Sequence, residues 1–162
     1  MQRTILILFL LSTILVNAQN SEAMECNLEK DNKLWKIQFA NAKTKAQRIV
    51  LIREKIISDS IYHEIQPVVK TVHGPILEYA DQNGNYCGWK IQFILQFTGG
   101  NWYELNLNKK PQLLSLLMTL DSINLDHIYY DLRNNNRPSS RVGMVKLTTR
   151  DSSLKRMVKN VW

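Results

Sequence analysis

Apolar and polar side chains alternate most regularly along residues 86–97. From residue 89 onward the odd positions are aromatic or aliphatic and the even positions are mostly polar: Trp89, Ile91, Phe93, Leu95 and Phe97 against Lys90, Gln92, Ile94 and Gln96. Because successive side chains of a strand point to opposite faces, the pattern predicts a half-buried antiparallel strand. Residues 76–80 and the turn at 81–85, which contains Asn83-Gly84, complete a predicted β-hairpin.

Shorter alternating runs predict the rest of a sheet. Strands are expected at residues 101–108, 128–132 and 141–149, and a short one is possible at 68–72. Thr98-Gly99-Gly100 turns the chain before the first of these. Residues 133–140, RNNNRPSS, form the longest run of turn-forming residues and are expected to be a loop.

Helical periodicity appears in three places. One apolar stripe predicts a long N-terminal helix over about 31–58, on the residues Trp35, Phe39, Ala42, Ala46, Ile49 and Ile56. Residues 111–122 start with proline and carry leucines nearly all round, which predicts a buried middle helix. Residues 151–162 predict an amphipathic C-terminal helix, capped by Asp151 or Ser152.

The order of these elements predicts an α+β domain with an antiparallel sheet of about five strands. Residues 1–18 are expected to be a signal peptide, residues 19–30 a flexible leader and residues 31–162 a single domain. The remaining 144 residues after cleavage suffice for one hydrophobic core. No later segment holds 18 consecutive apolar residues, so no transmembrane span is expected after processing.

The N-terminal segment has the three parts of a secretory signal. Arg3 supplies the positive start, residues 5–16 are apolar, and Val16-Asn17-Ala18 precedes the polar Gln19. About a dozen apolar residues are too few to span the roughly 20-residue hydrocarbon core as a permanent helix. We therefore expect a secreted or periplasmic protein that begins at Gln19.

Export changes the interpretation of the cysteines. Cys26 and Cys87 lie 61 positions apart in the mature chain. In an oxidising compartment such a pair most simply forms one disulfide, which would tie the N-terminal segment to the sheet. A thiol nucleophile is the alternative, because Tyr86-Cys87-Gly88-Trp89 partly resembles the nucleophile region of papain-like proteases. The upstream Gln and second Cys of that signature are missing.

The net charge of +7 is concentrated at the C-terminus. Residues 19–132 hold 12 basic and 13 acidic residues, a net of −1, whereas residues 133–162 hold eight basic residues and Asp151 alone, a net of +7. We expect this end to meet an anionic protein or envelope surface, through the residues Arg133, Arg137, Arg141, Lys155, Arg156 and Lys159. Nucleic acid is not expected, because stacking aromatics are missing there and the protein is exported.

The sequence contains none of the common motifs for nucleotides, metals or hydrolysis, so no cofactor and no metal are expected. Three histidines, His63, His73 and His127, and a carboxylate pair, Glu78 with Glu104, leave a small secreted hydrolase open as the alternative. Trp102 shares a strand face with Glu104 and Asn106 and is a candidate contact residue. The favoured interpretation is an exported binding protein without enzymatic activity, such as an inhibitor, an immunity-type protein or an envelope-associated module.

Overall fold

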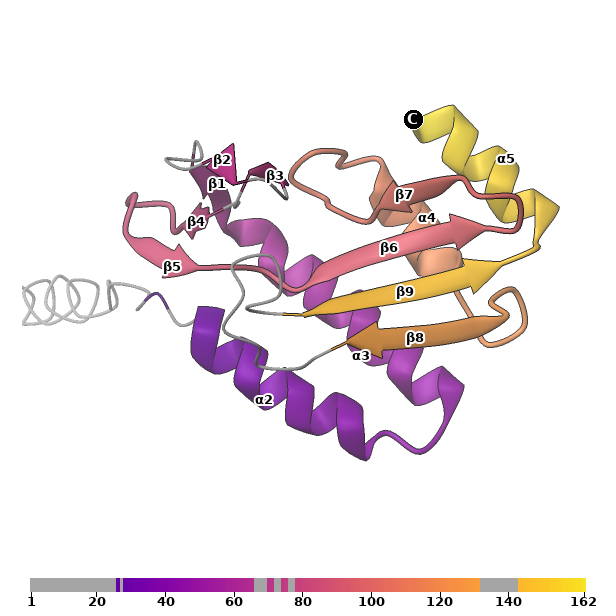
Figure 1. Cartoon of the computed structure of the whole chain (residues 1–162), viewed down its shortest axis with the longest axis horizontal. Helices are drawn as coiled ribbons and strands as arrows, with labels where there is room; N and C mark the ends of the chain where they lie inside the picture. The colour runs from indigo at the N-terminus through magenta and orange to yellow at the C-terminus, as the bar shows by residue number, and fades with distance from the viewer. Residues whose placement is uncertain (1–25, 27, 66–69, 72–73, 76–77, 132–142) are drawn as a thin grey trace, which may run out of the picture.

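A computed structural model gives the fold of residues 26, 28–65, 70–71, 74–75, 78–131 and 143–162. The predicted signal peptide, most of the predicted leader and the predicted loop at 133–140 lie outside these residues. Within them the chain is a mixed α+β structure, which confirms the predicted fold class (Figure 1).

Two helices stand where one long helix was predicted. Helix α2 spans Leu28–Asn41 and helix α3 spans Lys45–Ser58. The break has a local cause that the apolar stripe does not reveal. Thr44 and Gln47 form a capping box, in which each side chain accepts a hydrogen bond from the other residue's backbone N–H, so a new helix begins at Lys45. The indole Nε1 of Trp35 donates to the Leu51 carbonyl at 2.9 Å and joins the two helices.

The main sheet has four strands in the order β7-β6-β9-β8. Their bounds are Gln92–Phe97 for β6, Trp102–Glu104 for β7, His127–Asp131 for β8 and Met144–Thr149 for β9. Neighbours β6–β7 and β9–β8 are antiparallel, but the central pair β6–β9 is parallel, with Gln92 opposite Met144 and Phe97 opposite Thr149. The prediction of a purely antiparallel sheet was therefore wrong at its centre, because alternation fixes a strand's faces but not its neighbour's direction.

A second sheet pairs three short strands in the order β1-β4-β5, namely His63–Ile65, Glu78–Ala80 and Tyr86–Gly88. The antiparallel pair β4–β5 confirms the predicted hairpin. The predicted continuous strand over 86–97 is divided between the two sheets at Gly88, whose φ of +100° is accessible to glycine but strained for other residues. Strands β2 (Lys70–Thr71) and β3 (Gly74–Pro75) form a small separate ribbon, and the 3₁₀ turn η1 (Asp59–Ile61) follows α3.

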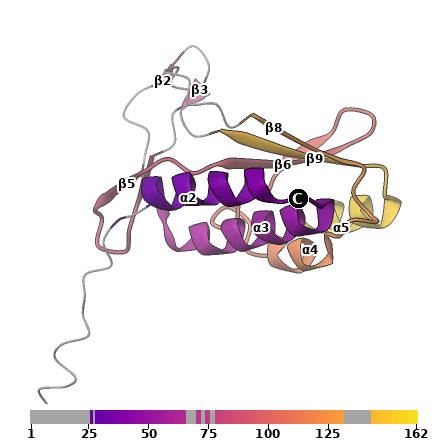
Figure 2. The same cartoon turned by 90° about the horizontal axis from the view of Figure 1, so that it is seen from below.

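The helices of the described chain cover one face of the main sheet (Figure 2). Helix α4, Leu113–Thr119, buries Leu113, Leu116 and Leu117 but leaves Leu114 and Met118 exposed, so it is covered on one side and not all round as predicted. Helix α5, Ser152–Val161, confirms the predicted C-terminal helix. The main core lies between this helical layer and the inner sheet residues, which include Phe93, Leu95, Phe97, Val145 and Leu147.

A smaller core sits beside the second sheet. Leu28, Tyr62, Tyr79 and Cys87 are buried together, and Cys26 packs against them. Cys26 and Cys87 form the predicted disulfide, with their Cα atoms 5.0 Å apart. The bond therefore fastens the start of α2 to strand β5, as the sequence predicted.

Candidate binding surface

The face of the main sheet that points away from the helices has no helical cover within the described chain (Figure 2); we call it the open face. Strand registers place its side chains in three cross-strand rows. They are Trp102–Gln96–Thr148–His127, then Glu104–Ile94–Lys146–Tyr129, and finally Gln92–Met144–Asp131. Residues in one row are cross-strand neighbours, so the open face combines aromatic, aliphatic, basic and acidic groups, the acidic ones being Glu104 and Asp131.

Large apolar side chains remain in solvent on the open face. Trp102 is 60% exposed, Tyr129 53% and Met144 39%. The ammonium group of Lys146 lies 5.2 Å from the ring centroid of Tyr129, and the His127 ring lies 5.8 Å from the same ring. Tyrosine, tryptophan and methionine are enriched at protein interfaces, and these three exposed side chains give the open face that composition.

The predicted basic residues of α5 lie elsewhere. Leu154 and Val158 bury one side of this helix in the main core, which leaves Lys155, Arg156 and Lys159 toward its outer side. The Asp151 carboxylate caps the helix by accepting from the Ser153 and Leu154 backbone N–H groups, and its pKa is lowered chiefly by the Ser153 hydroxyl bond. Because α5 belongs to the helical layer, the structure does not bring these basic residues onto the open face with Trp102 (Figure 2).

Sequence reasoning missed an aromatic end to the α5 surface. Trp162 is 47% exposed, its ring lies 5.8 Å from the Tyr103 ring, and the Lys110 ammonium lies 5.2 Å from its centroid. In the sequence, the only signal for this contact is a tryptophan two positions after Lys159-Asn160, and that signal is weak. The arginines Arg133, Arg137 and Arg141 lie outside the described residues; they follow β8 and precede β9 in the sequence.

A polar cluster joins the two sheets. The Lys90 ammonium donates to the Tyr62 carbonyl at 3.0 Å and to Asn108 Oδ1 at 2.6 Å, and it lies 4.1 Å from the Tyr79 ring centroid. Burial lowers the pKa of Lys90 to about 8, and burial also raises the pKa of the Tyr79 hydroxyl. Lys90 therefore has a structural role: it connects Tyr62, which follows η1, with Tyr79 on β4 and Asn108 after β7.

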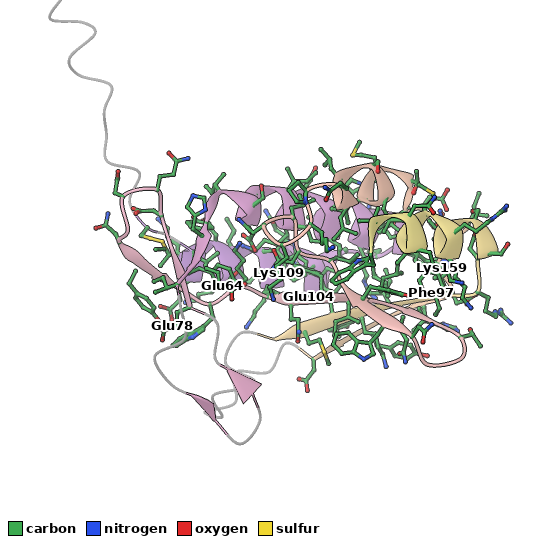
Figure 3. The ribbon with its side chains drawn as sticks, turned by 90° about the horizontal axis from the view of Figure 1, so that it is seen from above. Glu64, Glu78, Phe97, Glu104, Lys109 and Lys159 are labelled. Atoms are coloured by element: carbon green, nitrogen blue, oxygen red, sulfur yellow. A yellow bond between two sulfur atoms is a disulfide. The ribbon has the colours of Figure 1, made fainter. Side chains whose placement is uncertain are left out.

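Charged side chains cover this cluster on the outside. Lys109 Nζ lies 3.0 Å from Glu104 Oε2 and 3.9 Å from Glu64 Oε2, so one ammonium bridges two carboxylates. Figure 3 shows these three side chains close together, whereas Glu78 lies apart from Glu104. The carboxylate nearest to Glu104 across Lys109 is thus Glu64, and the predicted Glu78–Glu104 pair is not brought together.

The histidines are not gathered into one site either. His63 lies on β1 and His127 on β8, in different sheets and both exposed, while His73 lies outside the described residues. The described residues contain no group of three His, Cys, Asp or Glu side chains able to hold a metal ion. The disulfide withdraws the Cys87 thiol from nucleophilic chemistry. The hydrolase alternative stays a prediction without a geometric site.

Comparison with known proteins gives no relative from which a role could be transferred. No family model, no curated protein sequence and no solved structure matches this chain. Among the described helices, none has the length and apolar character needed to cross a membrane.

The polar cluster makes stability depend on pH. Since the pKa of Lys90 is about 8 in the folded chain and near 10.5 in the unfolded chain, the unfolded state binds more protons between these values. The contribution of Lys90 to the free energy of unfolding should therefore rise from pH 8 to pH 10. Urea unfolding of wild type and Lys90→Met at pH 7, 8, 9 and 10 isolates this contribution. The free energy of unfolding of the wild type minus that of the variant should increase with pH. A constant or decreasing difference would show that Lys90 is not desolvated.

Proposed function

We propose that this chain is an exported, non-enzymatic binding protein that holds an acidic protein partner on its open face. The observation that carries the proposal is the arrangement of one layer of helices behind a sheet whose other face leaves Trp102, Tyr129 and Met144 exposed, with the Lys146 ammonium 5.2 Å from the Tyr129 ring centroid. The disulfide between Cys26 and Cys87 is compatible with an oxidising compartment outside the cytoplasm. The signal-like residues 1–18 support the same location.

The charge distribution supports an acidic partner. Arg133, Arg137 and Arg141 lie in the sequence between β8 and β9, the strands that carry His127, Tyr129 and Lys146. We propose that these three arginines add positive charge that guides the approach of the partner. Lys155, Arg156 and Lys159 on α5 form a separate basic surface. An anionic envelope surface would bind there, and not on the open face.

Site-specific photocrosslinking in the producing cell tests this proposal. A benzophenone amino acid at position 102 should crosslink one acidic protein, because interface aromatics bury themselves in the partner. The matched control position is Leu34 on α2, which is 56% exposed against 60% for Trp102 but belongs to the helical layer. Position 34 should give no crosslink to that protein.

Binding of the crosslinked protein then separates the aromatic and electrostatic contributions. Trp102→Ser should weaken the affinity about tenfold or more, as expected for an aromatic contact of 1–2 kcal/mol or larger. Exchanging Arg133, Arg137 and Arg141 for glutamine should slow association and flatten its salt dependence. Equal crosslinking at positions 34 and 102, or binding to anionic lipid vesicles that Trp102→Ser leaves unchanged, would contradict a protein partner on the open face.

A further inference from the structure

Among the strands that the structure describes, β8 lies at an edge of the main sheet, and it lacks the lysine, proline and bulge that commonly protect such edges. It lies at the end of the order β7-β6-β9-β8, and its sequence His-Ile-Tyr-Tyr-Asp contains no lysine, proline or glycine. Its pairing with β9 runs through all five residues without a register shift. Natural proteins commonly blunt an exposed edge with lysine, proline or a bulge, so an edge lacking all three is suited to receive another strand.

The hydrogen bonds of β9 identify which backbone groups of β8 point outward. The carbonyls of Gly143 and Thr149 accept from the backbone N–H groups of Gln92 and Thr98, so odd-numbered residues of this strand face β6. Even-numbered residues of β9 therefore face β8, where they pair with residues 127, 129 and 131. The backbone N–H and C=O groups of Ile128 and Tyr130 consequently point away from the sheet, toward the place of a fifth strand.

The guanidinium group of Arg48 lies beside the outer edge of β8. The guanidinium carbon of Arg48 lies 5.5 Å from the Tyr130 ring centroid and 5.6 Å from the Phe39 ring centroid. Its Nε donates to the Ala42 carbonyl at 3.2 Å, and no carboxylate of the described residues pairs with it. Arginine presents five donors in a planar fork, so Arg48 retains donors for a carboxylate in the bidentate geometry that the group favours.

We propose that β8 accepts an extended acidic segment of the partner as an additional strand, with a partner carboxylate held by Arg48 on the helix side of the sheet. This inference rests on the proposed function and names the way in which the partner docks. Main-chain bonds to Ile128 and Tyr130 supply affinity, and alternate side chains of the added strand supply specificity. Tyr129 connects this edge to the open face, so one partner can occupy both.

A second copy of this chain fits the edge less well. The helix-side residues of β8 are Ile128 and Tyr130, while Asp131 belongs to the open face. Two β8 strands paired along their edges would therefore present no carboxylate of their own strands to Arg48. The chemistry at the edge selects instead a strand that presents an Asp or Glu to Arg48 on the helix side of the sheet.

Panning a random twelve-residue peptide library on the immobilised mature protein tests the inference without knowledge of the natural partner. Enriched peptides should share an acidic residue and bind Arg48→Gln at least tenfold more weakly. Tyr130→Pro removes an outward N–H without removing a bond to β9, and it should abolish binding. Tyr130→Val, which loses the same ring but keeps the N–H, is the matched control and should retain more affinity than Tyr130→Pro.

Amide hydrogen exchange with the best peptide gives a second readout, which a general loss of stability does not mimic. Binding should slow exchange of the Ile128 and Tyr130 amides more than tenfold. Three results would contradict the proposal that β8 accepts an acidic strand. They are peptides that bind Tyr130→Pro and wild type equally, enriched peptides without acidic residues, and a dimer of this chain that Tyr130→Pro dissociates. If the Trp102 crosslink to an acidic protein persists in Tyr130→Pro, the proposed function stands and only this docking mode fails.

Discussion

Replacing Cys87 with serine is expected to lower the free energy of unfolding by about 4 kcal/mol. The disulfide closes a loop with a sequence separation of 61 residues, and the loop-closure entropy removed from the unfolded chain has this size in the chain-entropy relation. The loss should fall hardest on the smaller core, because Cys87 is buried there with Leu28, Tyr62 and Tyr79. Urea unfolding of the oxidised wild type and the variant measures the difference.

Two controls separate the bond from the side chain. Cys26→Ser removes the same bond at a less buried position, and it should cost nearly as much as Cys87→Ser. Reduced wild-type protein should unfold at a urea concentration close to that of Cys26→Ser. If reduction changes the free energy of unfolding by less than about 1 kcal/mol, the bond does not constrain the unfolded chain as we expect.

Replacing Asp59 with alanine is expected to destabilise the protein by about 3–5 kcal/mol, the range for removing one partner of a buried ion pair. Lys55 Nζ lies 2.7 Å from Asp59 Oδ1, with side-chain exposures of 4% and 7%. Burial raises the pKa of Asp59, while the neighbouring Lys55 ammonium opposes that rise. Without the carboxylate, the Lys55 ammonium would remain buried beside the cationic Lys90 with no opposite charge.

The double variant Lys55→Met, Asp59→Leu distinguishes the cost of a lone charge from the value of the pair. Because apolar groups of similar volume can replace a buried ion pair with little loss, the double variant should be at least about 2 kcal/mol more stable than Asp59→Ala. Thermal unfolding monitored by circular dichroism provides the comparison. If the double variant is no more stable than Asp59→Ala, the loss in Asp59→Ala comes from losing the ion pair and not from leaving the Lys55 charge without a partner.

Part of the candidate site follows from local patterns. Alternation along 89–97 correctly separated Phe93, Leu95 and Phe97 from the polar residues of β6, because the faces of a strand depend only on sequence parity. The same parity placed Trp102 opposite to Tyr103, and the structure confirms that Trp102 is exposed and Tyr103 is packed against the core. The charge of the C-terminus is likewise a property of composition alone.

Other parts depend on long-range contacts. Lys55 lies off the apolar stripe of its helix, yet it is buried together with Asp59, the first residue of η1. Arg48 belongs to the beginning of α3, and only the packing of α2 and α3 under β8 places its guanidinium at the Tyr130 ring. The i,i+4 spacing of Lys55 and Asp59 permits an ion pair, but local sequence does not reveal that the pair is buried or that Arg48 reaches the Tyr130 ring.

The sequence by itself determined the α+β class, the alternation of strand faces, the amphipathic C-terminal helix, the opportunity for a Cys26–Cys87 disulfide and the concentration of charge after residue 132. These features depend on periodicity, composition and spacing, which are local or additive. The tertiary structure alone decided that β6 and β9 are parallel neighbours, that β8 is an edge and that α5 and Trp102 lie on different sides of the sheet. These features depend on which distant segments pair, and that choice is made by packing of the whole chain around its cores.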